Sequence, residues 1–451
     1  MPRTENLVSK LKEILGEANI VNDPEKLKAY ALDGKQPKIA VSPGTIDEIS
    51  KVIALANEKN LAVIPRGNGT KMEMGGIPRK MDLLLLTSRL NRITDKDCEN
   101  LTLSAESGIA LSEVQKNLAQ EGRGYFLPLD PPFSSKATLG GIVAANASGP
   151  KRLLYGTSRD LITGIKAVFP NGDIVVSGGK TVKNVSGYDM CKLLIGSFGT
   201  LGILYEMTFK LLPLPEKNAT LSVSFGKLEE ADGFVREIIS SQLVPASIEM
   251  VNSPALEFLK HRIPLATDGN YLVAIGLEGV VEGVDRQLAE MESIGKKHGA
   301  AKVEALNPKE GGAFWIALRD FSDAAEFISL KSNFTISKRG EMIGSYEKMA
   351  KESGAECALI CHSGSGILHS YLFAGMGRKV KAEGFAELIQ KFTAEAVKYE
   401  GNLVVESAPP ALKKKIDVWG EVRSDAGIVR RIKEEIDPKG ILNPGRFVGG
   451  I

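Results

Sequence analysis

The sequence has few of the residues that build disulfide frameworks or iron–sulfur clusters. Its 451 residues include four cysteines, Cys98, Cys191, Cys357 and Cys361, and none of them form a CxxC pair. Their spacing fits no cluster motif, so any iron–sulfur cluster has to be carried by another subunit. The simplest interpretation is a reduced, cytoplasmic protein.

Long apolar runs and an excess of one charge are also missing. No apolar run reaches the roughly 18 residues that a membrane-spanning helix needs. The N-terminal MPRTENLVSKLKEIL has charges among its apolar positions, which indicates an amphipathic helix and not a signal peptide. The 57 basic and 55 acidic residues give a net charge of +2, which does not favour nucleic-acid binding. Contact with the inner membrane is expected only through partners.

Glycine, in contrast, is abundant, with 47 residues. The chain is too long for one ordinary core, so two or three domains are expected. Apolar patterning predicts a strand in PKIAVSP, a helix in TIDEISKVIALANEKN and a strand in LAVIP, which together form a β-α-β unit. Thr45 is the predicted N-cap of this helix, and Glu48 is predicted to complete a capping box.

Two hairpins are predicted before Pro215, and an α+β layer after it. GIKAVFPNGDIVVSGG has the turn signal Asn171-Gly172 between two strands, and TLGILYEMTFKLLPLP resembles a second hairpin. Strand and helix patterns then alternate, which predicts an open α+β sandwich of ferredoxin-like plan. FWIALRDF is predicted to be helical, and ECALICHSG is predicted to be a strand.

Four glycine-rich stretches are candidates for binding a large ligand. They are Arg66–Thr70, Thr138–Pro150, Lys183–Asp189 and Gly196–Ile203. None is a dinucleotide-binding fingerprint or a P-loop. Each taken alone is typical of ordinary turns, but four within about 140 residues favour a ligand with a pyrophosphate, because glycine allows close backbone approach with exposed amides.

The order of these motifs resembles a known family. PRGNGT, ATLGGIVAANASGPKRLLYGTSRD, KNVSGYDMCKLLIGSFGTLGI and DPKGILNPGR are similar to the FAD-binding oxidoreductases of the vanillyl-alcohol oxidase class, also called PCMH-type. Within that class the similarity is greatest to glycolate oxidase subunits and bacterial D-lactate dehydrogenases. The resemblance implies an α+β fold, with a PCMH-type FAD-binding domain of two α+β subdomains and a ferredoxin-like cap over the flavin ring.

The resemblance also implies domain limits and an FAD site. Residues 1–215 and the returning segment 405–451 are expected to form the FAD domain, and 216–404 the cap. The opening loop is expected to wrap the pyrophosphate. Asn68 stands where covalently linked relatives have histidine, so the FAD is expected to be non-covalent. The implied cofactor-binding residues are Arg66, Gly67, Asn68, Gly69, Thr70, Pro128, Asp130, Thr138, Gly140, Gly141, Ala144, Asn146, Ser148, Gly149, Gly156, Asp160, Gly202, Ile203 and Asn443.

The catalytic candidates come partly from the residues themselves and partly from the resemblance. Arg319 is the candidate for holding a substrate carboxylate in a bidentate pair, with a surface salt bridge as the alternative, and Lys331 is a second cation. Related D-lactate dehydrogenases bind a divalent metal through two histidines and a glutamate. His362, His369 and Glu406 match these ligands for Zn, Mn or Fe, and a hydrogen-bonded histidine pair is the alternative.

The sequence departs from that pattern where the relatives have their catalytic base. Ser407 follows Glu406 at the position of the base histidine, and Ser365 and Ile367 replace an aspartate and an asparagine. These departures leave both the metal and the proton-abstraction step open, and His369 is the remaining candidate for the catalytic histidine.

The implied activity is oxidation of a small 2-hydroxy acid, D-lactate or glycolate, by hydride transfer to flavin N5. Electrons then pass to an iron–sulfur subunit or to quinone, with a sister FAD subunit as a further partner. A non-catalytic accessory FAD subunit is the main alternative, and an aryl-alcohol or sugar-lactone oxidase is another.

Overall fold

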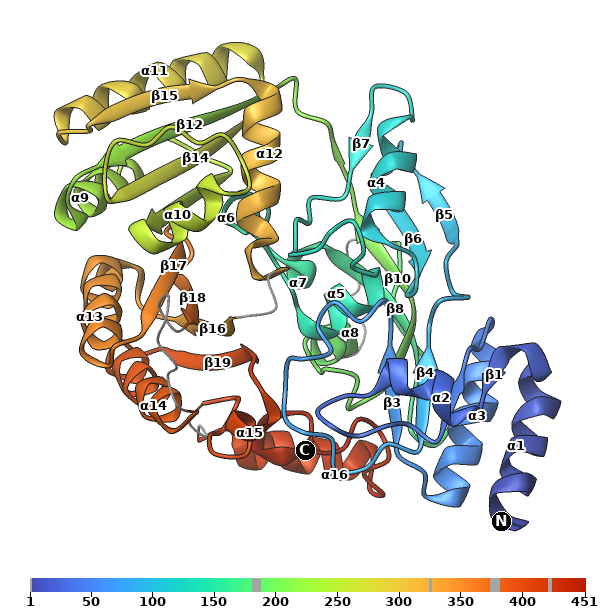
Figure 1. Ribbon diagram of the computed structural model, residues 1–451. Coiled ribbons are helices and arrows are strands. Elements are labelled where there is room, and N and C mark those ends of the chain that lie inside the picture. The colour runs from blue at the N-terminus through green and yellow to red at the C-terminus, as the bar shows by residue number, and fades with distance from the viewer. Residues whose placement is uncertain (1, 181–187, 324–326, 374–381, 421–423) are drawn as a thin grey trace. The chain divides into compact units, whose positions relative to one another are not determined.

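The computed structural model describes residues 2–180, 188–323, 327–373, 382–420 and 424–451. The chain forms two compact units, whose elements are labelled in Figure 1. Unit 1 comprises Met1–Ser148, Thr157–Leu214 and Val422–Ile451, and unit 2 comprises Gly149–Gly156 and Pro215–Glu421.

The first sheet of unit 1 is small and mixed, with strand order β1-β2-β4-β3. Its last three strands are parallel, and β1 is antiparallel to β2. The predicted β-α-β unit is confirmed, and the N-terminal helix packs with α3 against this sheet. The elements are α1 (Pro2–Leu15), β1 (Ile20–Val21), α2 (Pro24–Leu27), β2 (Ile39–Val41), α3 (Ile46–Lys59), β3 (Val63–Arg66) and β4 (Leu83–Leu86).

Helix α3 begins at the predicted residue, but its capping box differs from the prediction. The Thr45 side chain accepts a hydrogen bond from the Glu48 amide at 3.2 Å, which confirms the N-cap. The Glu48 carboxylate does not return to the Thr45 amide, because it accepts the Gly44 amide at 2.7 Å and pairs with Arg89 at 3.3 Å.

The second sheet of unit 1 is antiparallel, with strand order β5-β6-β10-β8-β9. The predicted hairpin at Asn171-Gly172 is confirmed, with Gly172 at φ 92°. The second predicted hairpin is wrong: β10 is one long strand between β6 and β8, and β11 pairs with β7 instead.

Helices α4, α5 and α8 contribute to the core of this second sheet. The elements are β5 (Ile93–Asp97), β6 (Thr102–Glu106), α4 (Leu111–Ala119), β7 (Tyr125–Phe126), α5 (Leu139–Ala145), α7 (Ser158–Leu161), β8 (Ile162–Val168), β9 (Ile174–Gly178), α8 (Met190–Leu194), β10 (Ile203–Lys210), β11 (Leu212–Pro213) and α16 (Ala426–Ile436).

Unit 2 is built on one antiparallel sheet with strand order β15-β12-β14-β13-β17-β18-β16-β19. Helices α11, α9, α13 and α14 follow one another along it in Figure 1 and share one hydrophobic core with it. The elements are α6 (Arg152–Tyr155), β12 (Lys217–Phe225), α9 (Leu228–Ile239), β13 (Ser247–Asn252), α10 (Ser253–Lys260), β14 (Tyr271–Gly279), α11 (Val281–Lys297), β15 (Lys302–Leu306), α12 (Pro308–Arg319), β16 (Ile328–Asn333), α13 (Arg339–Glu352), β17 (Glu356–His362), β18 (Ile367–Phe373), α14 (Ala382–Lys398), β19 (Asn402–Ser407) and α15 (Pro410–Lys413).

The two faces of this sheet differ in character. Alternate residues such as Leu359 and Leu368 join the core under the four helices. Their neighbours point to the opposite face, because successive side chains of a strand alternate. There, α10 and α12 pack over an apolar region. The same face carries a set of charged and ionisable side chains, called here the polar cluster: Glu249, Lys331, His362, His369 and Glu406.

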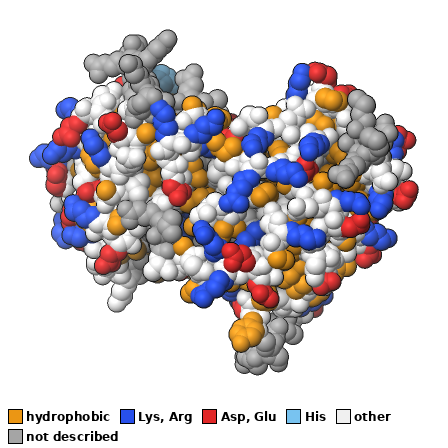
Figure 2. All heavy atoms as spheres, turned by 90° about the horizontal axis from the view of Figure 1, so that it is seen from below, with side chains coloured by type: hydrophobic (Ala, Val, Ile, Leu, Met, Phe, Trp, Pro, Cys, Tyr) orange, Lys and Arg blue, Asp and Glu red, His pale blue; other side chains and the backbone are white. Residues whose placement is uncertain are grey.

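The charged side chains at the surface are mixed in sign. Acidic and basic groups are interspersed on the face shown in Figure 2, as expected from a net charge of +2. Within the described residues, no helix has the length and apolarity needed to cross a bilayer.

Candidate functional site

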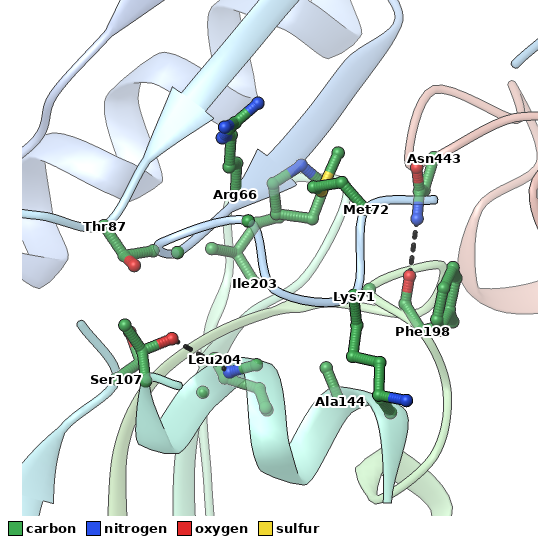
Figure 3. Close-up of a pocket in the computed structure, with 18 of the residues that line it drawn as sticks. Arg66, Lys71, Met72, Thr87, Ser107, Ala144, Phe198, Ile203, Leu204 and Asn443 are labelled. Carbon is green, nitrogen blue, oxygen red and sulfur yellow. Dashed lines mark hydrogen bonds between the residues drawn. The ribbon is translucent and has the colours of Figure 1, made fainter. Parts of the chain in front are cut away.

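A cavity with about 780 Å³ of empty space lies among the glycine-rich loops of unit 1 (Figure 3). Three of the four predicted glycine stretches meet here, together with the C-terminal tail; most of the other, Lys183–Asp189, lies outside the described residues. The lining residues are Pro65 to Met72, Thr87, Ser107, Thr138, Gly140, Gly141, Ala144, Ala145, Phe198, Gly199, Gly202, Ile203, Leu204, Asn443 and Arg446.

Glycine is required at several points of the cavity wall. A Cβ on Gly67 would stand 2.2 Å from Thr138 Oγ1, and a Cβ on Gly140 would stand 2.7 Å from Ser107 Cβ. Gly69 has φ +83°, a conformation that other residues rarely adopt. At these points the wall is formed by backbone, which lets a long ligand approach the amides closely.

The tail reaches the cavity because it extends the first sheet. The Val63 amide donates to Ile441 O at 2.8 Å, and the Asn443 amide donates to Val63 O at 2.9 Å. Asn443 Nδ2 donates to Phe198 O at 2.6 Å, as Figure 3 shows. Among the described residues, Asn443 Oδ1 is buried and accepts no hydrogen bond. A ligand with a hydrogen-bond donor fits this orphaned oxygen, which supports the predicted cofactor site.

Most of the predicted FAD residues line this cavity, and the others do not. Asp160 is engaged elsewhere: its carboxylate accepts the Thr157 amide at 2.8 Å and caps α7. Gly156 belongs to unit 2 by its contacts. A cofactor role for the residues outside the cavity lining remains a prediction: Pro128, Asp130, Asn146, Ser148, Gly149, Gly156 and Asp160.

Sequence reasoning missed several lining residues, above all Arg446. Its guanidinium is 1% exposed, donates to Met72 O at 2.6 Å and to Gly76 O at 3.0 Å, and lies 5.5 Å from the Phe198 ring. Burial lowers the pKa of Arg446 to about 10. The sequence does contain a signal for Arg446, because this residue ends the family motif LNPGR. The sequence contains no such signal for Ser107, Lys71 and Met72, because these residues lie outside the glycine motifs.

In unit 2, the polar cluster is assembled by strand register. Glu249 on β13 faces His362 on β17, and Lys331 on β16 faces His369 on β18. The two histidines are diagonal neighbours, with ring centroids 4.9 Å apart and planes at 67°. His369 lies within β18, two residues after that strand begins.

Glu406 enters the cluster through a β-bulge. Ser329 pairs with Ser407 and Leu330 pairs with Val405, so Glu406 is the extra residue between them. Bulges re-aim side chains, and Glu406 Oε2 lies 3.6 Å from His369 Nδ1. This distance is too long for a hydrogen bond, although the two groups still interact electrostatically.

Burial controls the protonation of both histidines. It lowers the pKa of His362 to about 3, and the positive charges of Lys331 and Arg152 act in the same direction. Burial lowers the pKa of His369 to about 4, with Glu406 acting in the opposite direction. Both rings are therefore neutral at pH 7.

The geometry does not support the predicted metal triad as it stands. Among the described residues there is no group of three or more His, Cys, Asp or Glu side chains arranged to hold a metal ion. His362 Nδ1 is taken by Glu249, at 2.7 Å from both carboxylate oxygens. The metal role of His362, His369 and Glu406 remains a prediction, and no catalytic step is derived through it.

The two predicted carboxylate-binding cations have different surroundings. Arg319 ends helix α12, which confirms the helix, and its Nε donates to Asp320 Oδ1 at 3.1 Å. This ion pair corresponds to the alternative interpretation of Arg319. Lys331 belongs to the polar cluster and acts electrostatically on both histidines.

Comparisons with known proteins agree with this architecture. Residues 37–178 match the family model described as FAD binding domain, and residues 214–447 match the model described as FAD linked oxidases, C-terminal domain. The chain belongs to the FAD-linked oxidases, a family of flavoenzymes, and it has an FAD-binding domain.

Individual relatives span nearly the whole chain. The glycolate oxidase subunit GlcD of Bacillus subtilis (strain 168) is 29% identical, over 98% of this chain and 97% of its own length. A D-lactate dehydrogenase of Archaeoglobus fulgidus is 28% identical, over 98% of both chains. The structure of p-cresol methylhydroxylase with substrate bound has a TM-score of 0.75 at 17% identity, over 99% of this chain and 97% of its own, and shows the shared fold. The resemblance to PCMH-type flavoproteins is confirmed.

Proposed function

We propose that this flavoenzyme oxidises a small 2-hydroxy acid, with D-lactate and glycolate as the candidate substrates. The observation that carries the proposal is the near full-length similarity to a glycolate oxidase subunit and to a D-lactate dehydrogenase. Bound FAD supplies the two-electron acceptor that side chains lack. An iron–sulfur subunit or quinone then takes the electrons, and a sister FAD subunit is a further candidate partner.

The candidate groups for this chemistry are two cations and two histidines of unit 2. Lys331 and Arg319 are the candidates for holding the substrate carboxylate, since cations pair strongly with carboxylates. A neutral histidine accepts a proton at pH 7, and the lowered pKa of His369 keeps that ring neutral. His362 is equally neutral and is the second candidate for the base.

Anaerobic mixing tests the activity directly. D-Lactate or glycolate, added to the purified holoprotein without oxygen, is expected to bleach the visible flavin absorbance within the time of a catalytic turnover. An aryl alcohol or sugar lactone, which has no carboxylate, is the control. Bleaching by the control alone would point to the aryl-alcohol or sugar-lactone oxidases instead.

A second candidate function is an accessory FAD subunit that does not oxidise the substrate itself. The observation that favours it is Ser407, which stands where related D-lactate dehydrogenases have their base. In that case neither 2-hydroxy acid bleaches the isolated chain, and bleaching appears only when a sister subunit is added.

The cofactor is proposed to be non-covalent, because Asn68 replaces the linking histidine of covalent relatives. Acid precipitation is expected to release all the flavin into the supernatant, and yellow colour retained in the pellet contradicts this. Elemental analysis of the same preparation tests the divalent metal: a content near one per chain supports the predicted ligands His362, His369 and Glu406.

A further inference from the structure

Helix α6 belongs to unit 2, although the chain on both sides of it belongs to unit 1. Residues Gly149–Gly156 have their contacts in unit 2, whereas Met1–Ser148 and Thr157–Leu214 form part of unit 1. The segment follows α5, whose end lines the cofactor cavity, but the side chains of residues 151–155 have no part in that lining. They are therefore available for a role in unit 2.

One acidic side chain holds α6 on the sheet of unit 2. Glu278, on β14, lies 2.5 Å from Lys151 Nζ through Oε1 and accepts the Tyr155 hydroxyl at 2.6 Å through Oε2. Lys151 and Tyr155 are four residues apart, so both side chains lie on the same face of the helical turn. Burial and the hydrogen bond to Glu278 raise the pKa of Tyr155, so its hydroxyl keeps the proton that it donates. These two contacts are called here the Glu278 latch.

The other side of α6 packs against the turn after β17. A Cβ on Gly364 would stand 2.6 Å from Leu153 Cδ1, so this leucine lies directly against the glycine. Gly364 follows His362 by two residues, and β13 lies between β14 and β17 in the sheet. The helix therefore reaches from β14 to β17 at the end of the sheet where Glu249 pairs with His362.

We propose that Arg152 is a substrate-binding residue, which the Glu278 latch holds at the polar cluster and which pairs with the carboxylate of the substrate. Arg152 lies in the chain between the two anchored residues Lys151 and Leu153. This inference rests on the proposed function and names a residue that binds its substrate.

The surroundings favour Arg152 over Arg319 for this role. Arg319 Nε already donates to Asp320 Oδ1 at 3.1 Å. Arg152 and Lys331 both act electrostatically on the ring of His362, so an anion beside this ring is attracted by two cations. A guanidinium also presents its donors as a planar fork that matches a carboxylate.

Binding of a 2-oxo acid tests the assignment without turnover. Pyruvate and glyoxylate, the products of D-lactate and glycolate oxidation, are titrated into the oxidised holoprotein by calorimetry. Arg152→Gln is expected to raise their dissociation constants about 10- to 100-fold, the loss usual for a hydrogen bond to a charged group. Arg152→Lys keeps the charge without the fork and is expected to recover part of the affinity. An unchanged constant in Arg152→Gln, or no binding of either acid to the unaltered holoprotein, overturns the proposal.

Tyr155→Phe tests the latch, because it removes one bond to Glu278 and leaves Arg152 in the chain. A smaller rise in the same dissociation constants is expected, together with faster amide hydrogen exchange in residues 149–156. Weaker binding without faster exchange, or faster exchange with unchanged binding, contradicts a latch that positions Arg152.

Arg286→Gln, on α11 of the same unit, is the matched control. Its side chain is 66% exposed, and its nearest carboxylate is Glu290 at 3.8 Å, so it is expected to change neither binding nor flavin reduction. If neither 2-hydroxy acid reduces the unaltered holoprotein while 2-oxo acid binding still depends on Arg152, the proposed oxidation fails and the carboxylate site stands. If Arg152→Gln is reduced by limiting D-lactate or glycolate as fast as the unaltered holoprotein, the assignment of Arg152 fails and the proposed oxidation stands.

Discussion

At the scale of single residues, close backbone packing forms the cofactor cavity. Gly67 has no room for a side chain, because Thr138 Oγ1 would lie 2.2 Å from its Cβ. Thr138 is not free to move away, since its side chain caps α5 by accepting the Gly141 amide at 3.3 Å. The loop that contains Gly67 and the start of helix α5 are therefore packed tightly against each other.

Replacing Gly67 with alanine is expected to weaken FAD binding. Overpacking of this kind costs roughly 1–3 kcal/mol of folding stability, and a loop that shifts to relieve it no longer presents its amides to the cofactor in the same place, so the FAD dissociation constant is expected to rise. Flavin fluorescence titration of the apoprotein measures it. Gly427→Ala is the control, since a Cβ there meets nothing within 4 Å; equal affinities in the two variants would rule out contact between this loop and the cofactor.

A buried carboxylate near the cavity gives a pH-dependent contribution to stability. Glu106 is not exposed and accepts the Arg92 amide at 2.9 Å, Arg92 Nη2 at 2.7 Å and the Tyr205 hydroxyl at 3.0 Å. Burial alone raises the pKa of Glu106, but these hydrogen bonds outweigh it and lower the pKa below its usual value.

A carboxyl group whose pKa is lower in the folded state than in the unfolded state stabilises the fold at pH values above its unfolded-state pKa. This contribution is lost as the pH falls through the folded-state pKa. Glu106→Gln is therefore expected to destabilise the protein by about 1–3 kcal/mol at pH 7 and by much less near pH 3. Urea unfolding at both values measures the difference. A variant equally destabilised at both would show that the charge of Glu106 is not the cause.

At the scale of elements, the C-terminal tail connects the loops of the cavity. Buried Lys433 on α16 donates to Thr200 O at 2.7 Å, Leu442 O at 3.0 Å and Asp437 Oδ2 at 2.5 Å. The Asp437 carboxylate also accepts the amides of Ile441 and Leu442. One ammonium group thus joins the helix, the tail and the loop that precedes β10.

Lys433→Met is expected to loosen this junction. It leaves buried carbonyls and a carboxylate without their donor, which destabilises by about 3–5 kcal/mol when one partner of a buried pair is removed. FAD affinity is expected to fall, and amide hydrogen exchange at Leu442 and Asn443 to rise. Lys439→Met removes an exposed lysine with one bond, to Asn57 O at 2.8 Å, and is expected to change neither measurement appreciably.

At the scale of the whole molecule, each hydrophobic cluster of the described residues lies within one unit. Three clusters belong to unit 1 and two to unit 2. The cavity is lined by residues of unit 1. Each unit therefore has a core of its own. A ligand bound in the cavity is expected to stabilise unit 1 directly.

Removal of FAD is expected to lower the stability of unit 1 in particular. Free FAD at 100 times its dissociation constant stabilises the binding state by about 2.7 kcal/mol. Hydrogen exchange of apoprotein and holoprotein, compared peptide by peptide, is expected to show protection concentrated in β3, α5 and the tail. Equal protection in the core strands β12 and β14 would contradict the assignment of the site to unit 1.

The sequence alone determined what depends on neighbouring residues. Glycine spacing identified the loops of the cavity, the Asn171-Gly172 turn identified one hairpin, and Thr45 identified a helix start. The family motifs led to the FAD-binding fold, because such motifs carry the close backbone approach that the cofactor needs.

Only the tertiary structure decided which distant strands lie side by side. TLGILYEMTFKLLPLP has the pattern of a hairpin, yet β10 continues as one strand between β6 and β8, because pairing with both neighbours satisfies more of its backbone. The bulge at Glu406, the pairing of Glu249 with His362, and the joining of the tail to Val63 depend on register across more than 70 residues of sequence. Local patterns contain no information on such register, since it is set by packing of the whole sheet.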